Sequence, residues 1–331
     1  MTPTPQTLLT NSAAVFSYLM KQLAEITKKF QLKSSKTRKL KNLFKYAYQK
    51  ELSSDSNLGL FIGPTKESVT LIRFFMKLLL ISRKIIGQEN LTSAFNAHLA
   101  GKRVIFFVNH TGVIDPPIIN YLLDEFIEKN FPKDNILWTW VAGRRVWDSF
   151  LLRIFSRCSR MITVFGNKYV KEAKEASEND PSKLEKFLSM RNHNSRALRW
   201  MRNSKDIIFV FPEGTWYSDG KLHKGDPTAI NVARIISNGG ENETIIIKCF
   251  LEGADHVLPA SGDPGDDFPR FLEVVKRGNV IFHVGIPENW LDILAKVPTG
   301  IAKNEVDKWI VDYIMRGIAQ HAKLEARGVY A

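Results

Sequence analysis

Short runs of β-branched and aromatic residues alternate with segments of helical apolar spacing from Gly101 onward, and this alternation restricts the fold most. Alternating strands and helices are typical of an α/β sheet with helices on both of its faces. Most of the runs have little polar interruption, as expected for strands that are covered on both sides. The predicted strands are Val104–Val108, Ile136–Val141, Met161–Phe165, Ile207–Phe211, Ile245–Leu251 and Val280–Val284.

The segments between these strands have the spacing and the start signals of helices. Asp180-Pro181-Ser182 is typical of a helix start, because the first turn tolerates proline. The predicted helices are Pro117–Lys129, Val146–Arg157, Ser182–Arg202 and Pro227–Ser237. The sequence therefore predicts an α/β fold with a central, mostly parallel or mixed sheet flanked by helices.

The first sixty residues have a different pattern, which is helical and rich in lysine. Ala13–Phe30 has helical apolar spacing, and Lys33–Leu52 is very basic. Gly63-Pro64 ends this pattern, since this dipeptide is a strong break in regular structure. We therefore predict a smaller N-terminal helical domain over residues 1–64 and an α/β domain over residues 65–331.

The most hydrophobic stretch, Val69–Ile86, is interrupted by four basic residues and is too short in apolar length to span a bilayer. Arg73, Lys77 and Lys84 fall near one helical face, which predicts a basic amphipathic helix. Such a helix could touch a membrane surface. The favoured alternative is a core helix with a solvated basic stripe.

Lysine and arginine exceed aspartate and glutamate by 47 to 34, a formal net charge of +13. A surplus of this size favours anionic partners, which include anionic lipid, phosphorylated substrates and an acidic carrier protein. Nucleic acid is a further anionic partner, but no pattern of interleaved aromatic and basic residues typical of RNA binding is present, so we do not expect it.

Cys158 and Cys249 lie far apart in sequence, in or next to apolar runs. Two buried thiols in a reducing compartment are the simplest interpretation, and we expect no metal because no histidine or cysteine cluster accompanies them. Met1–Asn11 has neither the arginines of a transit peptide nor the apolar core of a secretory signal. We therefore expect a cytoplasmic or plastid-stromal protein that is soluble or peripheral to a membrane.

Chemistry-bearing residues follow the first predicted strand, where the chain reads Asn109-His110-Thr-Gly-Val-Ile-Asp115 before a pair of prolines. A carboxylate that accepts the proton on one ring nitrogen of His110 would fix its tautomer, so that the other nitrogen could remove a proton from a hydroxyl. The spacing alone is weak evidence, and a structural histidine at the strand end is an equal alternative. The sequence thus offers His110 and Asp115 as a candidate general-base pair.

A second motif, Phe211-Pro212-Glu213-Gly214-Thr215, ends another predicted strand. Gly214 would allow a ligand to approach the backbone closely, and N–H groups exposed there could meet an anion. An ordinary turn is the alternative interpretation of this segment taken alone.

The two motifs together, about one hundred residues apart, resemble the glycerolipid acyltransferase superfamily, in which His-x4-Asp follows a strand and Phe-Pro-Glu-Gly-Thr comes later. Val141-Ala-Gly-Arg-Arg145 and the later strand that ends before Lys168 are similar to the soluble, plastid-type glycerol-3-phosphate acyltransferases. The resemblance implies an N-terminal helical domain before the catalytic one. It covers roughly half of the chain.

This resemblance implies that His110 is the general base, oriented by Asp115, in acylation of the sn-1 hydroxyl of glycerol 3-phosphate. The acyl donor would be an acyl carrier protein or coenzyme A thioester, with no further cofactor. Glu213, Gly214 and Thr215 would contribute to substrate binding. Peripheral contact with an anionic membrane is a further expected interaction.

Cations are needed for the acceptor's phosphate, and the resemblance offers Lys168, Arg144 and Arg145. Plastid-type enzymes carry two arginines after the second motif, where this chain has residues 215–218, Thr-Trp-Tyr-Ser. Lys221 or Lys224 could replace them. The departure keeps open acylation of lysophosphatidic acid at its sn-2 hydroxyl or of another polar acceptor. A basic lipid-binding protein without activity is the non-enzymatic alternative.

Overall fold

A computed structural model describes residues 61–143 except 133, residue 157, residues 159–331 except 216, 218 and 259–274, and single positions between 20 and 42. The predicted helix Val146–Arg157 lies almost entirely outside the described residues. Most of residues 1–60 also lie outside them, so the division into two domains stays a prediction.

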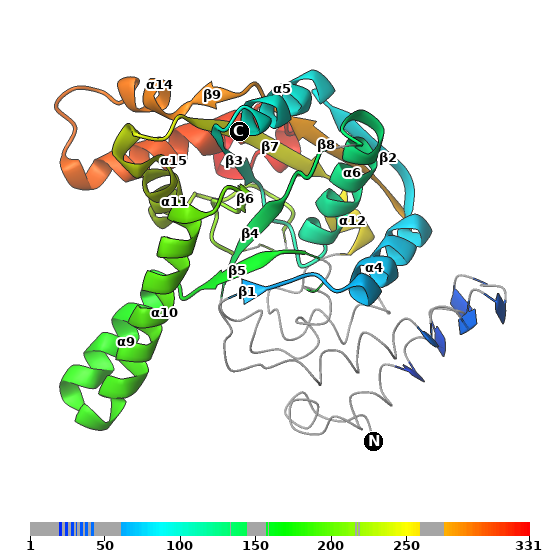
Figure 1. The fold of residues 1–331 in the computed structure, drawn as a ribbon, viewed down its shortest axis with the longest axis horizontal. Helices are drawn as coiled ribbons and strands as arrows, with labels where there is room; N and C mark the ends of the chain where they lie inside the picture. The colour runs from blue at the N-terminus through cyan, green and yellow to red at the C-terminus, as the bar shows by residue number, and fades with distance from the viewer. Residues whose placement is uncertain are drawn as a thin grey trace.

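A mixed sheet in the order β1-β5-β4-β6-β3-β7-β8-β2 forms the centre of the described part, with β9 paired to β7 (Figure 1). The strands β5, β4, β6, β3 and β7 run parallel to one another. At the two ends of this group, β1 is antiparallel to β5, and β8 is antiparallel to β7 but parallel to β2. The strands are β1 Phe61–Ile62, β2 Leu80–Ile86, β3 Arg103–Val108, β4 Trp138–Gly143, β5 Met161–Val164, β6 Ile207–Val210, β7 Thr244–Glu252, β8 Gly278–Val284 and β9 Glu288–Asn289.

Helices cover both faces of this sheet (Figure 1). One face is covered by α4 Lys66–Leu79, α5 Gln88–Leu99, α6 Asp115–Asn130 and α12 Ala254–Val257. The other is covered by α10 Leu184–Asn203, α11 Ile230–Ser237, α14 Trp290–Ala295 and α15 Lys303–Ala319. The helix α9, Asn167–Asn179, packs beside α10. The fold is therefore α/β with a sandwiched mixed sheet, as predicted.

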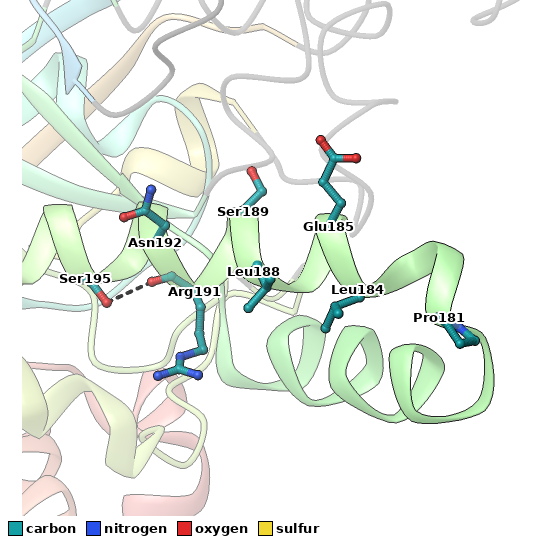
Figure 2. A pocket seen from close by; sticks show the side chains of 8 residues that line it. All are labelled: Pro181, Leu184, Glu185, Leu188, Ser189, Arg191, Asn192 and Ser195. Atoms are coloured by element: carbon teal, nitrogen blue, oxygen red, sulfur yellow. Dashed lines mark hydrogen bonds between the residues drawn. The ribbon is translucent and has the colours of Figure 1, made fainter.

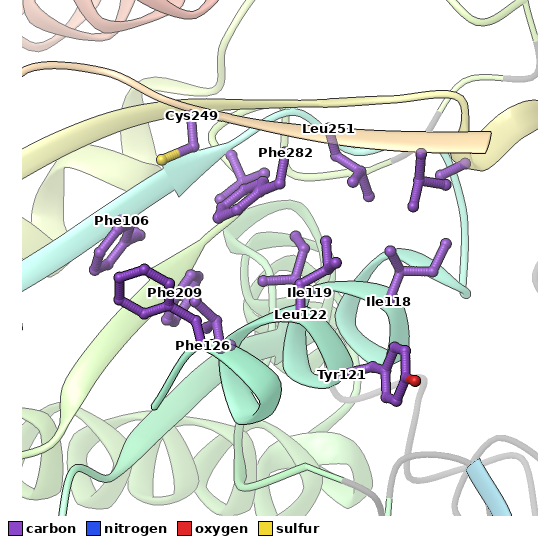
Figure 3. Packing of buried hydrophobic residues seen from close by; sticks show 14 of the residues in the cluster. Phe106, Ile118, Ile119, Tyr121, Leu122, Phe126, Phe209, Cys249, Leu251 and Phe282 are labelled. Carbon is purple, nitrogen blue, oxygen red and sulfur yellow. The ribbon is translucent and has the colours of Figure 1, made fainter. Parts of the chain in front are cut away.

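Alternate residues of the central strands pack into two separate hydrophobic cores, one on each face of the sheet. On the α6 face, Phe106 of β3 stacks on Phe209 of β6 with ring centroids 4.6 Å apart, and α6 packs Ile119 and Leu122 toward them (Figure 3). Phe107 points into the opposite core, which α15 covers. Because both faces are buried, these strands are apolar throughout, which explains why the sequence reveals them.

The six predicted strands are all confirmed, with ends shifted by up to two residues. The helix predicted over Pro117–Lys129 is also confirmed and begins two residues earlier, at Asp115. The helices predicted from Ser182 and Pro227 each open with a turn of 3-10 helix before the α-helix. The structure adds helices that the sequence analysis did not predict, α5, α9, α12, α14 and α15.

The prediction of one basic helix over Val69–Ile86 is wrong. The helix α4 ends at Leu79, and Leu80–Ile86 forms strand β2, which pairs in parallel with β8 at the edge of the sheet. This segment forms a strand rather than continuing the helix because three β-branched isoleucines follow Leu80 in it. Of the predicted basic stripe, Arg73 and Lys77 lie on α4 and Lys84 lies on β2, and Arg73 pairs with carboxylates of α6. No helix among the described residues has the length and apolarity to cross a membrane.

Candidate active site

The two sequence motifs meet at one edge of the sheet because their strands are parallel neighbours. Ile105 of β3 lies opposite Ile208 of β6, and both strands end at the same edge, followed by His110 and Glu213. In open α/β sheets, this edge beyond the carboxyl ends of the strands is where ligands bind. The topology therefore brings together residues that lie 103 positions apart.

His110 and Asp115 form the expected pair. Nδ1 of His110 lies 2.8 Å from Oδ2 of Asp115. The carboxylate already accepts backbone N–H groups, so the ring nitrogen must donate to it, which leaves the basic lone pair on Nε2. The side chain of His110 is 10% exposed and that of Asp115 is fully buried. The arrangement is that of an oriented imidazole able to take a proton from a substrate hydroxyl.

The turn that precedes α6 supplies the remaining partners of Asp115. Oδ2 accepts hydrogen bonds from the backbone N–H groups of Thr111 at 2.6 Å and Gly112 at 2.9 Å. Oδ1 accepts from the Thr111 hydroxyl at 2.8 Å. Asp115 is also the first residue of α6, where the positive end of the helix dipole favours a negative charge. The carboxylate is thus held in one position.

An aromatic stack fixes the plane of the imidazole. The ring of His110 lies flat on Phe211, with centroids 3.8 Å apart and an interplanar angle of 8°, and Phe211 stacks in turn on Trp140. The preceding residue, Asn109, bridges to β7 by donating to Leu251 O at 3.1 Å and accepting from Leu251 N at 2.6 Å. The end of β3 is therefore fastened before the chain turns to His110.

Glu213 joins the two motifs through backbone groups. Its Oε1 accepts from the N–H of His110 and its Oε2 from the N–H of His223, each at 3.0 Å. The residue is 5% exposed, and burial raises the pKa of its carboxyl to about 7 against the lowering effect of these two hydrogen bonds. Both oxygens are occupied by backbone donors, so its predicted role in substrate binding stays a prediction. The position of this carboxylate stabilises the backbone on either side of the site.

The turn after Glu213 differs in part from expectation. Gly214 has a φ of +71°, and its N–H donates to Phe211 O at 3.1 Å, so this N–H is used within the turn. Gly214 and Thr215 are both exposed at the surface of the site. Their predicted part in substrate binding remains to be tested.

The predicted phosphate-binding residues are placed only in part. Lys168 lies in the first turn of α9, after the carboxyl end of β5, but its side chain is outside the described part of the structure. Arg144 and Arg145 lie wholly outside the described residues. Lys221 and Lys224 are exposed in the loop that follows the second motif.

Sequence reasoning missed a second histidine beside the site. Nε2 of His223 lies 3.0 Å from both oxygens of Asp219, and its ring stacks on Tyr217 with centroids 3.6 Å apart. The spacing of His223 four residues after Asp219 could have signalled this pair. It lies next to the candidate base because Glu213 bridges the two backbones.

A hollow of about 910 Å³ along α10 lies apart from this site (Figure 2). It is lined by Pro181, Leu184, Glu185, Leu188, Ser189, Arg191, Asn192 and Ser195. None of these residues belongs to either motif. Among the described residues, no group of histidine, cysteine and carboxylate side chains is arranged to hold a metal ion.

The family of the chain follows from a match over residues 82–247. Residues 82–247 match the Acyltransferase family, and because the match covers half of the chain, the protein belongs to this family. No curated protein sequence matches the chain. A similar solved structure is the 1-acyl-sn-glycerophosphate (LPA) acyltransferase of Thermotoga maritima, with 15% identity and a TM-score of 0.40 over 83% of this chain and 88% of that one.

Proposed function

We propose that the protein transfers a fatty acyl group from a thioester to a hydroxyl of a phosphate-bearing glycerol acceptor. The observation that carries the proposal is the buried His110–Asp115 pair at the carboxyl edge of the sheet. Membership of the Acyltransferase family supports the reaction class. The sn-1 hydroxyl of glycerol 3-phosphate is the first acceptor to test, on the strength of the sequence resemblance.

In the proposed reaction, His110 acts as the general base and Asp115 as its positioning partner. Nε2 takes the proton of the acceptor hydroxyl while the oxygen attacks the thioester carbonyl carbon. The tetrahedral intermediate collapses, the C–S bond breaks, and the thiolate takes the proton back from His110. No protein nucleophile is needed, and the thioester is a co-substrate rather than a cofactor.

A second acceptor, lysophosphatidic acid acylated at its sn-2 hydroxyl, is favoured by one observation. The two arginines that bind phosphate in plastid-type enzymes are replaced by the segment 215–218. Lys168, Arg144 and Arg145 are proposed to bind the phosphate in either case. Acceptor identity is therefore a separate question from the reaction.

The test is an acyl-transfer assay with the full-length protein. Acyl carrier protein and coenzyme A thioesters are each offered with glycerol 3-phosphate and with lysophosphatidic acid, and the acylated product is identified by mass spectrometry. We expect transfer to at least one acceptor and its near-complete loss in His110→Ala. Transfer that survives in folded His110→Ala would overturn the assignment.

A further inference from the structure

The end of the chain packs directly against the loop that follows the second motif. We call residues 320–331, which follow α15, the C-terminal segment. The N–H of Leu222 donates to Ala326 O at 3.0 Å, and the N–H of Val329 donates to Leu222 O at 3.3 Å. Leu222 itself is 2% exposed. Both backbone groups of this loop residue are therefore bonded to the C-terminal segment.

The contact leaves no space for a side chain at two glycines. Gly328 has a φ of +57°, and a Cβ there would come closer than 3.0 Å to the backbone of Leu222. A Cβ on Gly225, three residues further along the loop, would overlap the side chain of Val311 on α15. The loop is thus fitted between α15 and the C-terminal segment, and displacing either one must displace the loop.

One peptide bond and two hydrogen bonds lead from this contact to the candidate base. The residue after Leu222 is His223, whose N–H donates to Oε2 of Glu213 at 3.0 Å. Oε1 of the same carboxylate accepts the N–H of His110 at 3.0 Å. Because Glu213 is buried, water cannot readily replace either of these donors.

We propose that the C-terminal segment is a positioning element of the active site, which sets the backbone of His110 through Leu222, His223 and Glu213. The contacts themselves connect the C-terminal segment to the backbone of His110. The effect of this connection on catalysis rests on the proposed function. Gly328 is the positioning residue that the proposal singles out. The groups that face Glu213 electrostatically are His223, Asp115 and Tyr330, and the last belongs to the C-terminal segment.

The experiment compares Gly328→Ala with Gly300→Ala in the full-length protein. Both glycines have a positive φ, +57° at Gly328 and +84° at Gly300, so both substitutions carry a backbone cost, and that at Gly300 is no smaller. Gly300 has no heavy atom within 4 Å of an added Cβ, whereas the methyl group at Gly328 must push Leu222 away. The difference between the two variants therefore reports the contact and not the glycine conformation.

The first readout is amide hydrogen exchange followed by NMR, which does not depend on activity. We expect Gly328→Ala to speed exchange at the amides of His110 and His223 about tenfold or more, with the amides of Val104–Phe107 in β3 unchanged and Gly300→Ala like wild type. Equal exchange at His110 in the two variants would overturn the link. If Gly328→Ala does not accumulate as folded protein, Gly225→Ala perturbs the same loop against the flexible side chains of Val311 and Met315.

The second readout is steady-state kinetics. A displaced base should lower kcat about tenfold in Gly328→Ala and leave the KM of the donor unchanged, while Gly300→Ala keeps both values. Faster exchange at His110 with an unchanged kcat would refute the positioning role. A wild-type protein that transfers no acyl group would instead refute the proposed function, and hydrogen exchange would still decide whether the link exists.

Discussion

Replacing Asp115 by asparagine separates the charge of this residue from its hydrogen bonds. The structure fixes how the amide must sit. Its oxygen has to occupy the place of Oδ2, where it accepts from Thr111 N, Gly112 N and His110 Nδ1, since an NH₂ group there would face three donors. The NH₂ group then faces the Thr111 hydroxyl, which can turn to accept. The tautomer of His110 is therefore kept, and the main loss is the negative charge.

The size of the effect follows from the change in one bond. When His110 takes the substrate proton in the wild-type protein, its hydrogen bond to Asp115 becomes an ion pair. A hydrogen bond to a charged group contributes about 1.5–3 kcal/mol, whereas one between neutral groups contributes about 0.5–1.5 kcal/mol. In Asp115→Asn the partner of His110 is neutral. The lost difference of about 1–2 kcal/mol corresponds to a fall in kcat of about 5- to 30-fold. Asp115→Asn should therefore be impaired rather than inactive.

Asp115→Ala should be much worse on both activity and stability. The N–H groups of Thr111 and Gly112 lose their acceptor, and each unsatisfied buried donor costs about 1–3 kcal/mol of unfolding free energy. His110 also loses its orientation, so kcat should fall by about 10²–10⁴-fold, as if the base were absent.

The assay is kcat from thiol release at saturating substrates, with unfolding free energy from urea titration of the same preparations. We expect kcat to decrease in the order wild type, Asp115→Asn, Asp115→Ala, and the unfolding free energy to be lowest in Asp115→Ala. Equal kcat for the two variants would show that charge and hydrogen bonds are not separable in this way. Full activity of Asp115→Asn would show that the charge does not stabilise the transition state.

Three further predictions follow from the site and the charge. His110→Ala should lower kcat by about 10²–10⁴-fold with little change in unfolding temperature, measured by activity and circular dichroism, because the ring lies at the edge of the core. Burial raises the pKa of Glu213 to about 7, so the folded state holds a proton that the unfolded state releases near its ordinary pKa, and stability should fall as pH rises from about 4.5 to about 7. Glu213→Gln should flatten this part of the urea-unfolding profile, and an unchanged slope would contradict it. With the net charge of +13, kcat/KM for an acidic carrier-protein donor should fall more steeply with salt than for a coenzyme A thioester, because exposed charges are screened over a Debye length of about 10 Å at 0.1 M. Salt-independent kcat/KM for the carrier protein, with strong binding of the enzyme to anionic vesicles, would instead assign the charge to a membrane.

The central strands were predictable because burial on both faces leaves a continuous apolar run. Every residue of β6 is buried, and β7 is buried up to its last residue. The edge strand β2 was not predictable from the same signal, since five of its seven residues are exposed and it continues the apolar pattern of α4. Whether such a segment becomes helix or strand depends on a partner, here β8, that lies almost two hundred residues away.

The candidate pair was predictable because it is local. Four residues separate His110 from Asp115, and the two prolines after Asp115 indicate where α6 begins, so the turn returns the carboxylate to the imidazole. The role of Glu213 could not be read in the same way. Its partners are backbone groups of residues 103 positions before and 10 positions after it, and no side-chain pattern reports a backbone donor.

The geometry also explains why the two motifs need each other. The first motif supplies the imidazole and its carboxylate, but two features that hold His110 come from the second, namely the Phe211 ring beneath it and the Glu213 carboxylate on its backbone N–H. His110 is thus held by Asp115 through Nδ1, by Phe211 through the face of the ring and by Glu213 through its backbone N–H. A base held from three directions keeps its orientation when the substrate arrives, and such preorganisation lowers the cost of reaching the transition state. Loss of the second motif should therefore disable the first even though all of its own residues remain.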